Sequence, residues 1–331
     1  MLTHYLVFLA ETATIVLALL ILAGGLIFIG RKGMRQPGAR IQVTDLRAQL
    51  RRNGALVEQQ RLDKASAKAA AKARKRHAKD EAAQVGDCTF VLDFKGDLRA
   101  SAVASLREEV SAILAAARPG DRVLLRLESG GGMVNAYGLA AAQLLRLRAA
   151  QLHLTVLVDQ VAASGGYLMA VTAHEIVASP FALVGSIGVV AQIPNFHRWL
   201  RERHIDFEQF TAGKYKRTVT LFGENTDAGR QKLREELEDI HAMFRHFVAE
   251  YRPSLDLEQV ATGEAWLGIR AQELGLVDRL ATSDTVIQEA ADRGRVLAVR
   301  ASSPSSWAQR LGLRAQQAWE GLLGAGDALR F

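Results

Sequence analysis

The sequence has little cysteine, little proline and few aromatic residues, and each shortage excludes a class of protein. Cys88 is its one cysteine among 331 residues, so an intramolecular disulfide, a multi-cysteine zinc cluster and a CxxC redox pair are all excluded. Cys88 lies in the apolar stretch CTFVLDF, where we interpret it as a small core residue. Hydrophobic residues make up 49% of the chain, enough for one large core or two modest ones.

Basic residues are concentrated in one part of the chain. The formal net charge is +7, and fifteen of the 42 Lys and Arg residues lie between Arg31 and Lys79. We therefore predict that residues 31–86 form a basic linker, helical or disordered, which either binds anionic lipid or is a soluble spacer. This segment has no aromatic residues interleaved with its basic ones to stack on bases, so we expect no nucleic acid partner.

A long uncharged run precedes the linker. Residues 12–30, TATIVLALLILAGGLIFIG, match the length of a helix that crosses a bilayer, so residues 1–30 are predicted to be a transmembrane anchor. A cleaved signal peptide would need positive charge before the run, which is absent. The basic residues that follow place the rest of the chain in the cytoplasm by the charge rule, with a single membrane pass.

From Asp87 the pattern of an α/β domain begins. Apolar strand-like stretches at 88–94, 121–129 and 152–159 alternate with helical patterns at 101–117, 134–150 and 167–175. This alternation predicts a largely parallel sheet in a domain spanning 87–285. Residues 225–251 predict a long amphipathic helix. Residues 286–331 predict a strand and an amphipathic helix that either docks on the domain or lies in the membrane interface.

Ser164, in VAASGGYLMA, is predicted to lie where a strand gives way to a helix. There it is either an N-cap or a nucleophile whose oxyanion is held by the unpaired amides of the helix start. A second such junction, ESGGGMV, places three glycines, Gly130 to Gly132, at the same edge of the sheet. Two neighbouring junctions of this kind form a crevice suited to polarising a carbonyl group.

A nucleophilic serine needs a base, and none of the eight histidines suits the role. His174 is ten residues beyond Ser164 in the predicted helix, about 15 Å along its axis. The stretch TAGKYKRTVT offers Lys214 and Lys216 instead. A lysine partly removed from water loses its proton more readily and can then act as a base, although a basic surface loop explains the same pattern.

Six stretches in order carry a family resemblance: VLDFKGDLRAS, LLRLESGGGMVNAYGLA, VDQVAASGGYLMA, ASPFALVGSIGVVAQIPNF, TAGKYKRTVTLFGENT and RPSLDLEQVATGEAWLG. With them the chain resembles the signal peptide peptidase A family of serine-lysine peptidases, in its SohB branch. The resemblance implies a ClpP/crotonase-like fold, Ser164 as nucleophile and Lys216 as general base. It implies oxyanion donors at Gly165 and at Gly131 or Gly132.

One departure from the family concerns the glycine turn. The family usually has Ser-Pro-Gly-Gly where this chain has Ser129 followed by three glycines. Without the proline the turn is less preorganised, and lower activity is expected. Extended residues on both sides of the crevice are expected to pair with a substrate strand: Met133, Val134, Ile187, Gly188 and Val189.

The resemblance also implies how the enzyme is organised. We expect a bacterial inner-membrane endopeptidase without a cofactor or metal, acting on extended apolar peptides such as signal peptide remnants or membrane-protein fragments. Serine and lysine are expected to come from adjacent protomers of a homo-oligomer. Ser186 is either a hydrogen-bond partner of the lysine or a turn residue. Two alternatives remain: an acyl-CoA enzyme of the crotonase type, and a catalytically inactive membrane scaffold.

Overall fold

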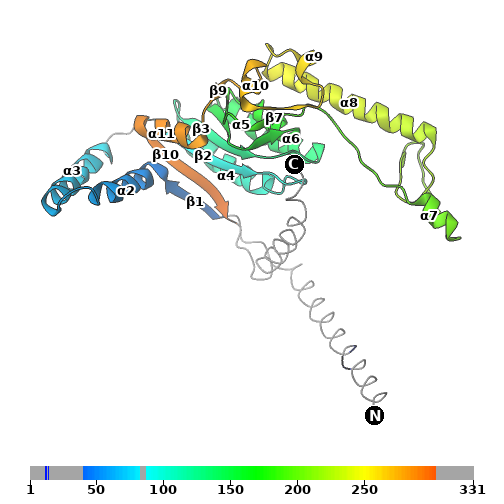
Figure 1. Cartoon of the computed structure of the whole chain (residues 1–331), viewed down its shortest axis with the longest axis horizontal. Coiled ribbons are helices and arrows are strands. Elements are labelled where there is room, and N and C mark those ends of the chain that lie inside the picture. The colour runs from blue at the N-terminus through cyan, green and yellow to red at the C-terminus, as the bar shows by residue number, and fades with distance from the viewer. Residues whose placement is uncertain (1–11, 13, 15–39, 83–86, 303–331) are drawn as a thin grey trace. The chain divides into compact units, whose positions relative to one another are not determined.

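The computed structural model describes residues 40–82 and 87–302, together with Thr12 and Thr14 (Figure 1). Residues 41–302 form one compact unit. Apart from the two threonines, the predicted anchor at 12–30 lies outside the described residues, and so does the predicted C-terminal helix beyond 302. Within the described part of the chain, no helix has the length and apolarity that a membrane span requires.

A seven-stranded sheet forms the centre of this unit, in the order β1-β10-β2-β3-β4-β6-β9 (Figure 1). Every pairing from β10 across to β9 is parallel, which confirms the predicted parallel α/β architecture. The strands are β1 (Arg40–Asp45), β2 (Cys88–Lys95), β3 (Arg122–Glu128), β4 (His153–Val158), β6 (Glu175–Ala178), β9 (Arg279–Leu280) and β10 (Arg295–Ser302).

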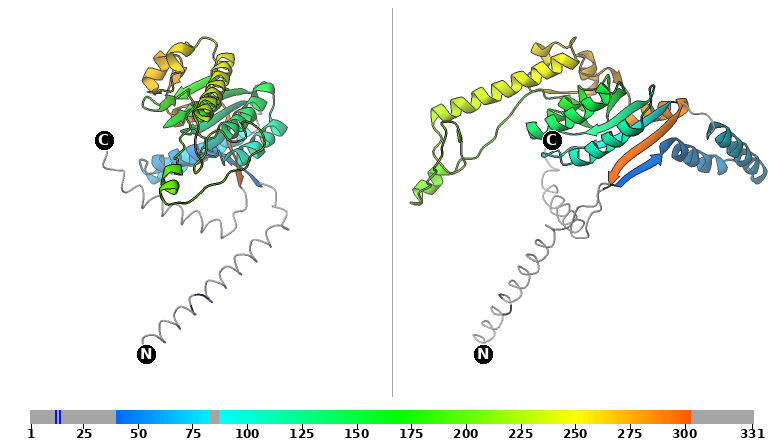
Figure 2. Two further views of the ribbon diagram at one scale, coloured as in Figure 1. Left: turned by 90° about the vertical axis from the view of Figure 1, so that its right-hand side faces the viewer. Right: turned by 180° about the vertical axis from the view of Figure 1, so that it is seen from behind.

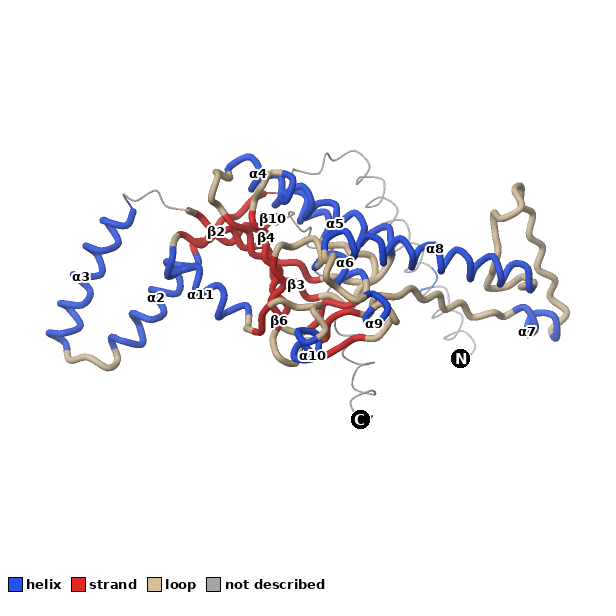
Figure 3. Tube along the Cα trace, turned by 90° about the horizontal axis from the view of Figure 1, so that it is seen from above, coloured by secondary structure: helices blue, strands red, loops and turns tan. Residues whose placement is uncertain are grey.

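Helices cover both faces of this sheet (Figure 3). In β2, Phe90, Leu92 and Phe94 belong to the larger core, whereas Val91 belongs to a second cluster on the opposite face. Strands buried on both faces are typical of parallel sheets, which explains their nearly continuous apolar runs. The larger core includes α4 (Val103–Ala116), α5 (Val134–Ala149), α6 (Gly165–Ala170) and α8 (Asp227–Tyr251), and the second includes α2 (Leu46–Gln59) and α11 (Ser283–Arg293).

A second, three-stranded sheet leads into the candidate site. It pairs β5 (Val161–Ala163) parallel to β7 (Leu183–Gly185) and β7 antiparallel to β8 (Ala265–Leu267). β5 ends directly before Ser164, so the sheet fixes where that residue lies. The remaining helices are α3 (Lys64–Ala82), α7 (His197–Glu202), α9 (Leu257–Val260) and α10 (Gly268–Glu273).

The ends of the unit differ from the predicted boundaries. The linker was expected to be helical or disordered, and β1 was not expected. β1 lies at the sheet edge beside β10 (Figure 2), and Leu46 and Leu50 of α2 pack against the second core. The boundary at 285 falls inside α11, and β10 is inserted between β1 and β2. Both differences arise because these segments cover the otherwise exposed face and edge of the sheet.

The helix predicted at 167–175 is shorter than expected. α6 ends at Ala170, and the hydroxyl of Thr172 donates to the carbonyl of Met169. The amide of His174 then donates to the carbonyl of Leu154, which starts the pairing of β6 with β4. The prediction that His174 continues this helix was therefore wrong, because strand pairing outweighs helical propensity here.

Candidate active site

Ser164 occupies a strained turn between β5 and α6. Its backbone has φ 52° and ψ −119°, a region that non-glycine residues rarely adopt and that persists only where the surrounding structure holds it. The side chain forms no capping hydrogen bond with α6. Of the two interpretations of this serine, the N-cap therefore does not describe the hydroxyl, which is left available for chemistry.

Backbone contacts on both sides hold this turn in place. The amide of Ser164 donates to the carbonyl of Gly185 at 2.8 Å, and its carbonyl accepts from Leu168 at 2.9 Å. Gly165 packs closely against the ring of Tyr137: a Cβ on Gly165 would lie 2.5 Å from Cγ of that ring. The sharp turn thus needs glycine immediately after the serine.

The glycine turn after β3 contacts the serine directly. Gly131 has φ 92°, and a Cβ on it would lie 2.7 Å from both the Ser164 Cβ and the Gly165 nitrogen. A Cβ on Gly132 would lie 2.3 Å from the carbonyl oxygen of Leu98, whereas one on Gly130 would meet nothing within 4 Å. Only the second and third glycines of the turn are therefore required by close packing.

The amides of the three candidate oxyanion residues are not equivalent. The Gly131 amide donates to Ser129 Oγ at 3.1 Å, so it is already used. Neither the Gly132 amide nor the Gly165 amide forms a hydrogen bond within residues 40–82 and 87–302. Two free amides close to a serine are the arrangement that stabilises a tetrahedral oxyanion.

The predicted substrate-binding residues fall into two groups. Met133 donates its amide to Leu98, and Val134 begins α5, so Val134 is helical and not extended as predicted. On the other side, Ile187 is buried, with its carbonyl 3.2 Å from His241 Nε2. Gly188 and Val189 follow in irregular backbone.

Ser186 shares the unusual backbone of Ser164, with φ 52°. Its amide donates to the carbonyl of Glu264 at 2.6 Å and its hydroxyl donates to the carbonyl of Gly263 at 3.2 Å. This hydroxyl therefore holds the turn whose Gly185 carbonyl accepts from the Ser164 amide.

Lys216 lies in a segment that we call the arm, residues 190–226. The arm contains α7 and is held by hydrogen bonds from Asn195 to the carbonyls of Thr220 and Gly223, and by a ring stack of Phe196 and Phe222. Lys216 is exposed and lines an open pocket of about 810 Å³ within the arm.

Lys216 and Ser164 do not meet within one chain. The arm packs on the start of α8, where the Lys232 ammonium lies 5.5 Å from the centre of the Tyr215 ring. Ile187 lies two residues after Gly185, whose carbonyl bonds to Ser164, and it contacts His241, nine residues after Lys232 along α8. Nine residues of helix span about 14 Å, so the lysine segment and the serine lie at different places along α8.

Lys214, the alternative base, is fully exposed. Its pKa is raised by a hydrogen bond with Tyr215, whose ring also lies 5.0 Å from its ammonium group. A general base needs a pKa moved in the opposite direction, so the surroundings of Lys214 do not suit that role.

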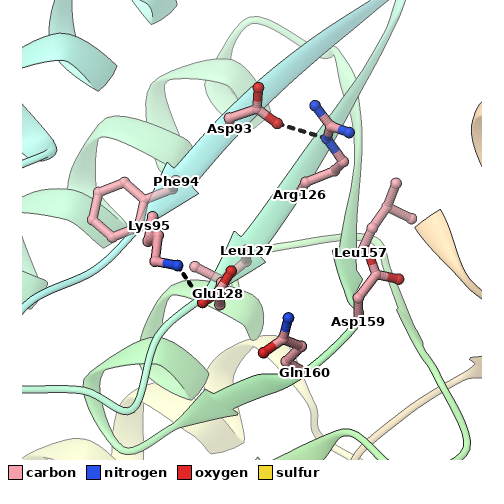
Figure 4. Close-up of a pocket in the computed structure, with 9 residues that line it drawn as sticks. All are labelled: Asp93, Phe94, Lys95, Arg126, Leu127, Glu128, Leu157, Asp159 and Gln160. Atoms are coloured by element: carbon pink, nitrogen blue, oxygen red, sulfur yellow. Dashed lines mark hydrogen bonds and ion pairs between the residues drawn. The ribbon is translucent and has the colours of Figure 1, made fainter. Parts of the chain in front are cut away.

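A separate pocket of about 220 Å³ lies at the carboxyl ends of β2, β3 and β4 (Figure 4). Its charges are paired: Asp93 accepts from Arg126 at 2.6 Å, and Lys95 lies 2.8 Å from Glu128. No predicted site residue lines it. Nor do three metal-ligating side chains gather anywhere in the described part of the chain. The fifth charged side chain of this pocket, Asp159, accepts from the amide and the hydroxyl of Ser283, so its charge is also satisfied.

Comparison with known proteins identifies the family. The model of the peptidase family S49 N-terminal region matches residues 1–144, and the model of peptidase family S49 matches residues 146–297. The chain belongs to peptidase family S49. It is a peptidase of the SohB branch, as the sequence motifs predicted.

Two relatives define the S49 branch further. A probable protease SohB from Haemophilus influenzae is 45% identical over 330 residues, covering 96% of this chain and 93% of its own. A probable protease SohB from Buchnera aphidicola subsp. Schlechtendalia chinensis is 55% identical over 198 residues, covering 60% of this chain and 65% of its own. A solved membrane-bound stomatin-specific protease aligns with TM-score 0.41 at 10% identity, covering 62% of this chain and 86% of that one, which is too low to assign a fold.

Two residues of the S49 site were not singled out by sequence reasoning. The ring of Tyr137 packs against Gly165, and the Leu98 carbonyl contacts Gly132 and accepts from the Met133 amide. Tyr137 looked like an ordinary member of an amphipathic helix, and Leu98 lies in a loop. Their importance is visible only in the structure, where the Tyr137 ring approaches Gly165 and the Leu98 backbone approaches Gly132.

Proposed function

We propose that this S49 peptidase is a membrane-anchored serine endopeptidase that uses Ser164 as nucleophile and Lys216 as general base. The observation that carries the proposal is the strained backbone of Ser164 with a free hydroxyl beside two unpaired glycine amides. A strain of this kind is retained in proteins mostly where function requires it.

In the proposed reaction, Ser164 Oγ attacks the carbonyl carbon of the peptide bond while Lys216 Nζ removes the hydroxyl proton. The amides of Gly132 and Gly165 bind the oxyanion, and Gly131 supports them with its own amide already bonded to Ser129. Lys216 then donates the proton to the leaving amine. Water hydrolyses the resulting acyl-enzyme, releasing the acid and restoring both side chains.

The two catalytic residues are proposed to come from neighbouring protomers of a homo-oligomer. Support comes from the separation of Lys216 from Ser164 along α8 and from the surface of the arm. Large apolar side chains are exposed there, with Phe210 at 89% and Trp199 at 51%. An apolar surface of this kind is typical of a protein interface. Burial of Lys216 in such an interface would remove its ammonium group from water and lower its pKa, as a general base requires.

We propose extended apolar peptides as substrates, such as signal peptide remnants or membrane-protein fragments. Gly188 and Val189 carry backbone groups that a substrate strand would pair with, which tolerates many side chains. The apolar run at 12–30 supports an anchor in the inner membrane, and the basic residues after it support a cytoplasmic catalytic domain and contact with anionic lipid.

Labelling by a fluorophosphonate probe tests the dyad. We expect the wild-type chain to be labelled, and both Ser164→Ala and Lys216→Ala to lose labelling while keeping their melting temperature. Lys214→Ala is the matched control and keeps labelling. Loss in Lys214→Ala with retention in Lys216→Ala would reassign the base. No labelling of the wild-type oligomer would favour the inactive scaffold.

Mixing two inactive variants tests the shared site. If each site takes its serine from one protomer and its lysine from the next, co-assembled Ser164→Ala and Lys216→Ala chains regain about one working site in four, since each half-site is intact with a chance of one half. A site within one chain would give no recovery. Mixing after cross-linking of each separate oligomer is the control.

A further inference from the structure

We propose that Tyr137 and Ser129 are positioning residues that preorganise the glycine turn of the oxyanion hole. They restrict the backbone of this turn, as would the proline that this chain lacks. The inference rests on the proposed function of Ser164. Neither residue touches the substrate carbonyl; both act through Gly131 and Gly132.

A directed chain of hydrogen bonds carries the proposal. The Tyr137 hydroxyl donates to the carbonyl of Asp97 at 2.8 Å, which uses its only proton. In the 2.6 Å contact between Ser129 Oγ and Tyr137 Oη, Ser129 is therefore the donor. The remaining lone pair of Ser129 Oγ accepts the amide of Gly131 at 3.1 Å. Each group therefore donates once and in one direction, from the Gly131 amide through the Ser129 and Tyr137 hydroxyls to the Asp97 carbonyl.

The hydrogen-bond chain through Tyr137 and Ser129 is buried. Tyr137 is fully buried and Ser129 is 2% exposed. Burial raises the pKa of Tyr137, so its phenol keeps the proton that it donates. Gly96 allows the two hydroxyls to meet, since a Cβ there would lie 2.4 Å from each of them. A serine hydroxyl bonded to an amide two residues later forms a turn, which here restricts Gly130, the residue between Ser129 and Gly131.

The other end of the glycine turn is held by the same loop. Asp97 and Leu98 are consecutive: the carbonyl of the first accepts from Tyr137, and the carbonyl of the second accepts from the Met133 amide at 2.8 Å. The Asp97 carboxylate in turn accepts from the amide and the hydroxyl of Ser101. Gly131 and Gly132 therefore lie between two anchors on one braced loop, and Gly131 packs directly against Ser164.

The hydrogen-bonded hydroxyls of Ser129 and Tyr137 also explain how a turn of three consecutive glycines can stay ordered without a proline. Proline restricts a turn through its ring, and a hydrogen-bonded serine restricts the same turn through its side chain. Gly130 itself contacts nothing, and its amide has no hydrogen-bond partner among the described residues. Ser129 is extended, in a bridge with Ala162, a conformation that a following proline favours. A proline at 130 is therefore compatible with this turn.

The test compares fluorophosphonate acylation in the full-length oligomer. Ser129→Ala and Tyr137→Phe are expected to lower the maximal acylation rate about ten- to a hundredfold, with the half-saturating probe concentration unchanged, because the oxyanion donors lose their position. Tyr167→Phe is the matched control: it removes another fully buried tyrosine hydroxyl, bonded to the Leu276 carbonyl, and is expected to change only the melting temperature.

Rescue separates positioning from general packing. Gly130→Pro is expected to leave the wild-type rate nearly unchanged and to restore most of the rate lost in Ser129→Ala. Equal rates in Ser129→Ala, Tyr137→Phe and Tyr167→Phe would overturn the inference, and so would a loss that Gly130→Pro does not restore. If instead Ser164→Ala retains labelling, the proposed function itself fails, whatever the rates of the other variants.

Discussion

Ser164 and Lys216 lie in two very different surroundings. The serine is held by a strained turn, a buried tyrosine and a braced glycine loop, all within one core. The lysine lies on an exposed arm whose aromatic residues face solvent. In the proposed mechanism, one chain therefore preorganises the serine and the glycine turn, whereas the position of the lysine depends on a partner. The proposal then predicts that activity requires assembly, because neither half of the site would work alone.

The largest effect is expected from breaking the ordered half. Gly165→Ala places a Cβ 2.5 Å from the Tyr137 ring, so the turn that carries Ser164 must move. We expect acylation to fall about a hundredfold or more, because a displacement near 1 Å has that effect in an active site. Gly130→Ala, at the open glycine, is the control. Equal acylation rates for the two variants would contradict the tight packing described for the turn.

The next effect concerns the arm. Phe210→Ser removes an exposed ring, so the melting temperature of the separate protomer is expected to stay nearly constant. If the arm is an interface, the oligomer dissociates at about tenfold or more higher concentration, and activity falls with it. Sedimentation measures the dissociation of the oligomer, and fluorophosphonate labelling measures the activity. Val57→Ser, on α2, removes another exposed apolar side chain, outside the arm, and should change neither.

Glu109 is a poorly satisfied buried carboxylate in the core around the serine, and it predicts a pH effect on stability. Glu109 is buried: Oε1 accepts from the Ala301 amide, while Oε2 has no hydrogen-bond partner among residues 40–82 and 87–302. Burial raises the pKa of this carboxyl. A raised pKa means that the folded state prefers the protonated form, so the contribution of Glu109 to stability is present at low pH and is lost as the pH rises through its folded pKa.

Glu109→Gln keeps the acceptor and removes the charge. At neutral pH we expect it to raise the free energy of unfolding by about 1 kcal/mol, which is roughly 2–4 °C in melting temperature. The gain should disappear as the pH falls below the ordinary range of a glutamate. Melting curves across pH measure this, and a gain that is independent of pH would contradict the role given to burial of the charge.

The smallest effect is expected at Lys214. This residue is exposed and its raised pKa comes from Tyr215, so Lys214→Ala should change activity by no more than about twofold. Peptide hydrolysis by the assembled enzyme measures it. A large loss would show that the arm presents Lys214, and not Lys216, to the neighbouring serine.

Much of the fold followed from pattern alone. The runs CTFVLDF and LHLTVLVD read as buried strands, and their alternation with helices predicted the parallel sheet that the structure contains. The short α6, by contrast, was misjudged, because the demand of β6 for pairing with β4 is not visible in local sequence. β1 was missed for the same reason: an edge strand is defined by its neighbour.

By itself, the sequence determined the family, the alternation of elements and the residue types of the site, since motifs and periodicity are local properties. Only the tertiary structure decided which glycine amides are free, that Tyr137 and Ser129 brace their turn, and that Lys216 lies away from Ser164 in its own chain. These depend on contacts between β3, α5, α6 and α8, which come together only when apolar burial packs the helices on the sheet.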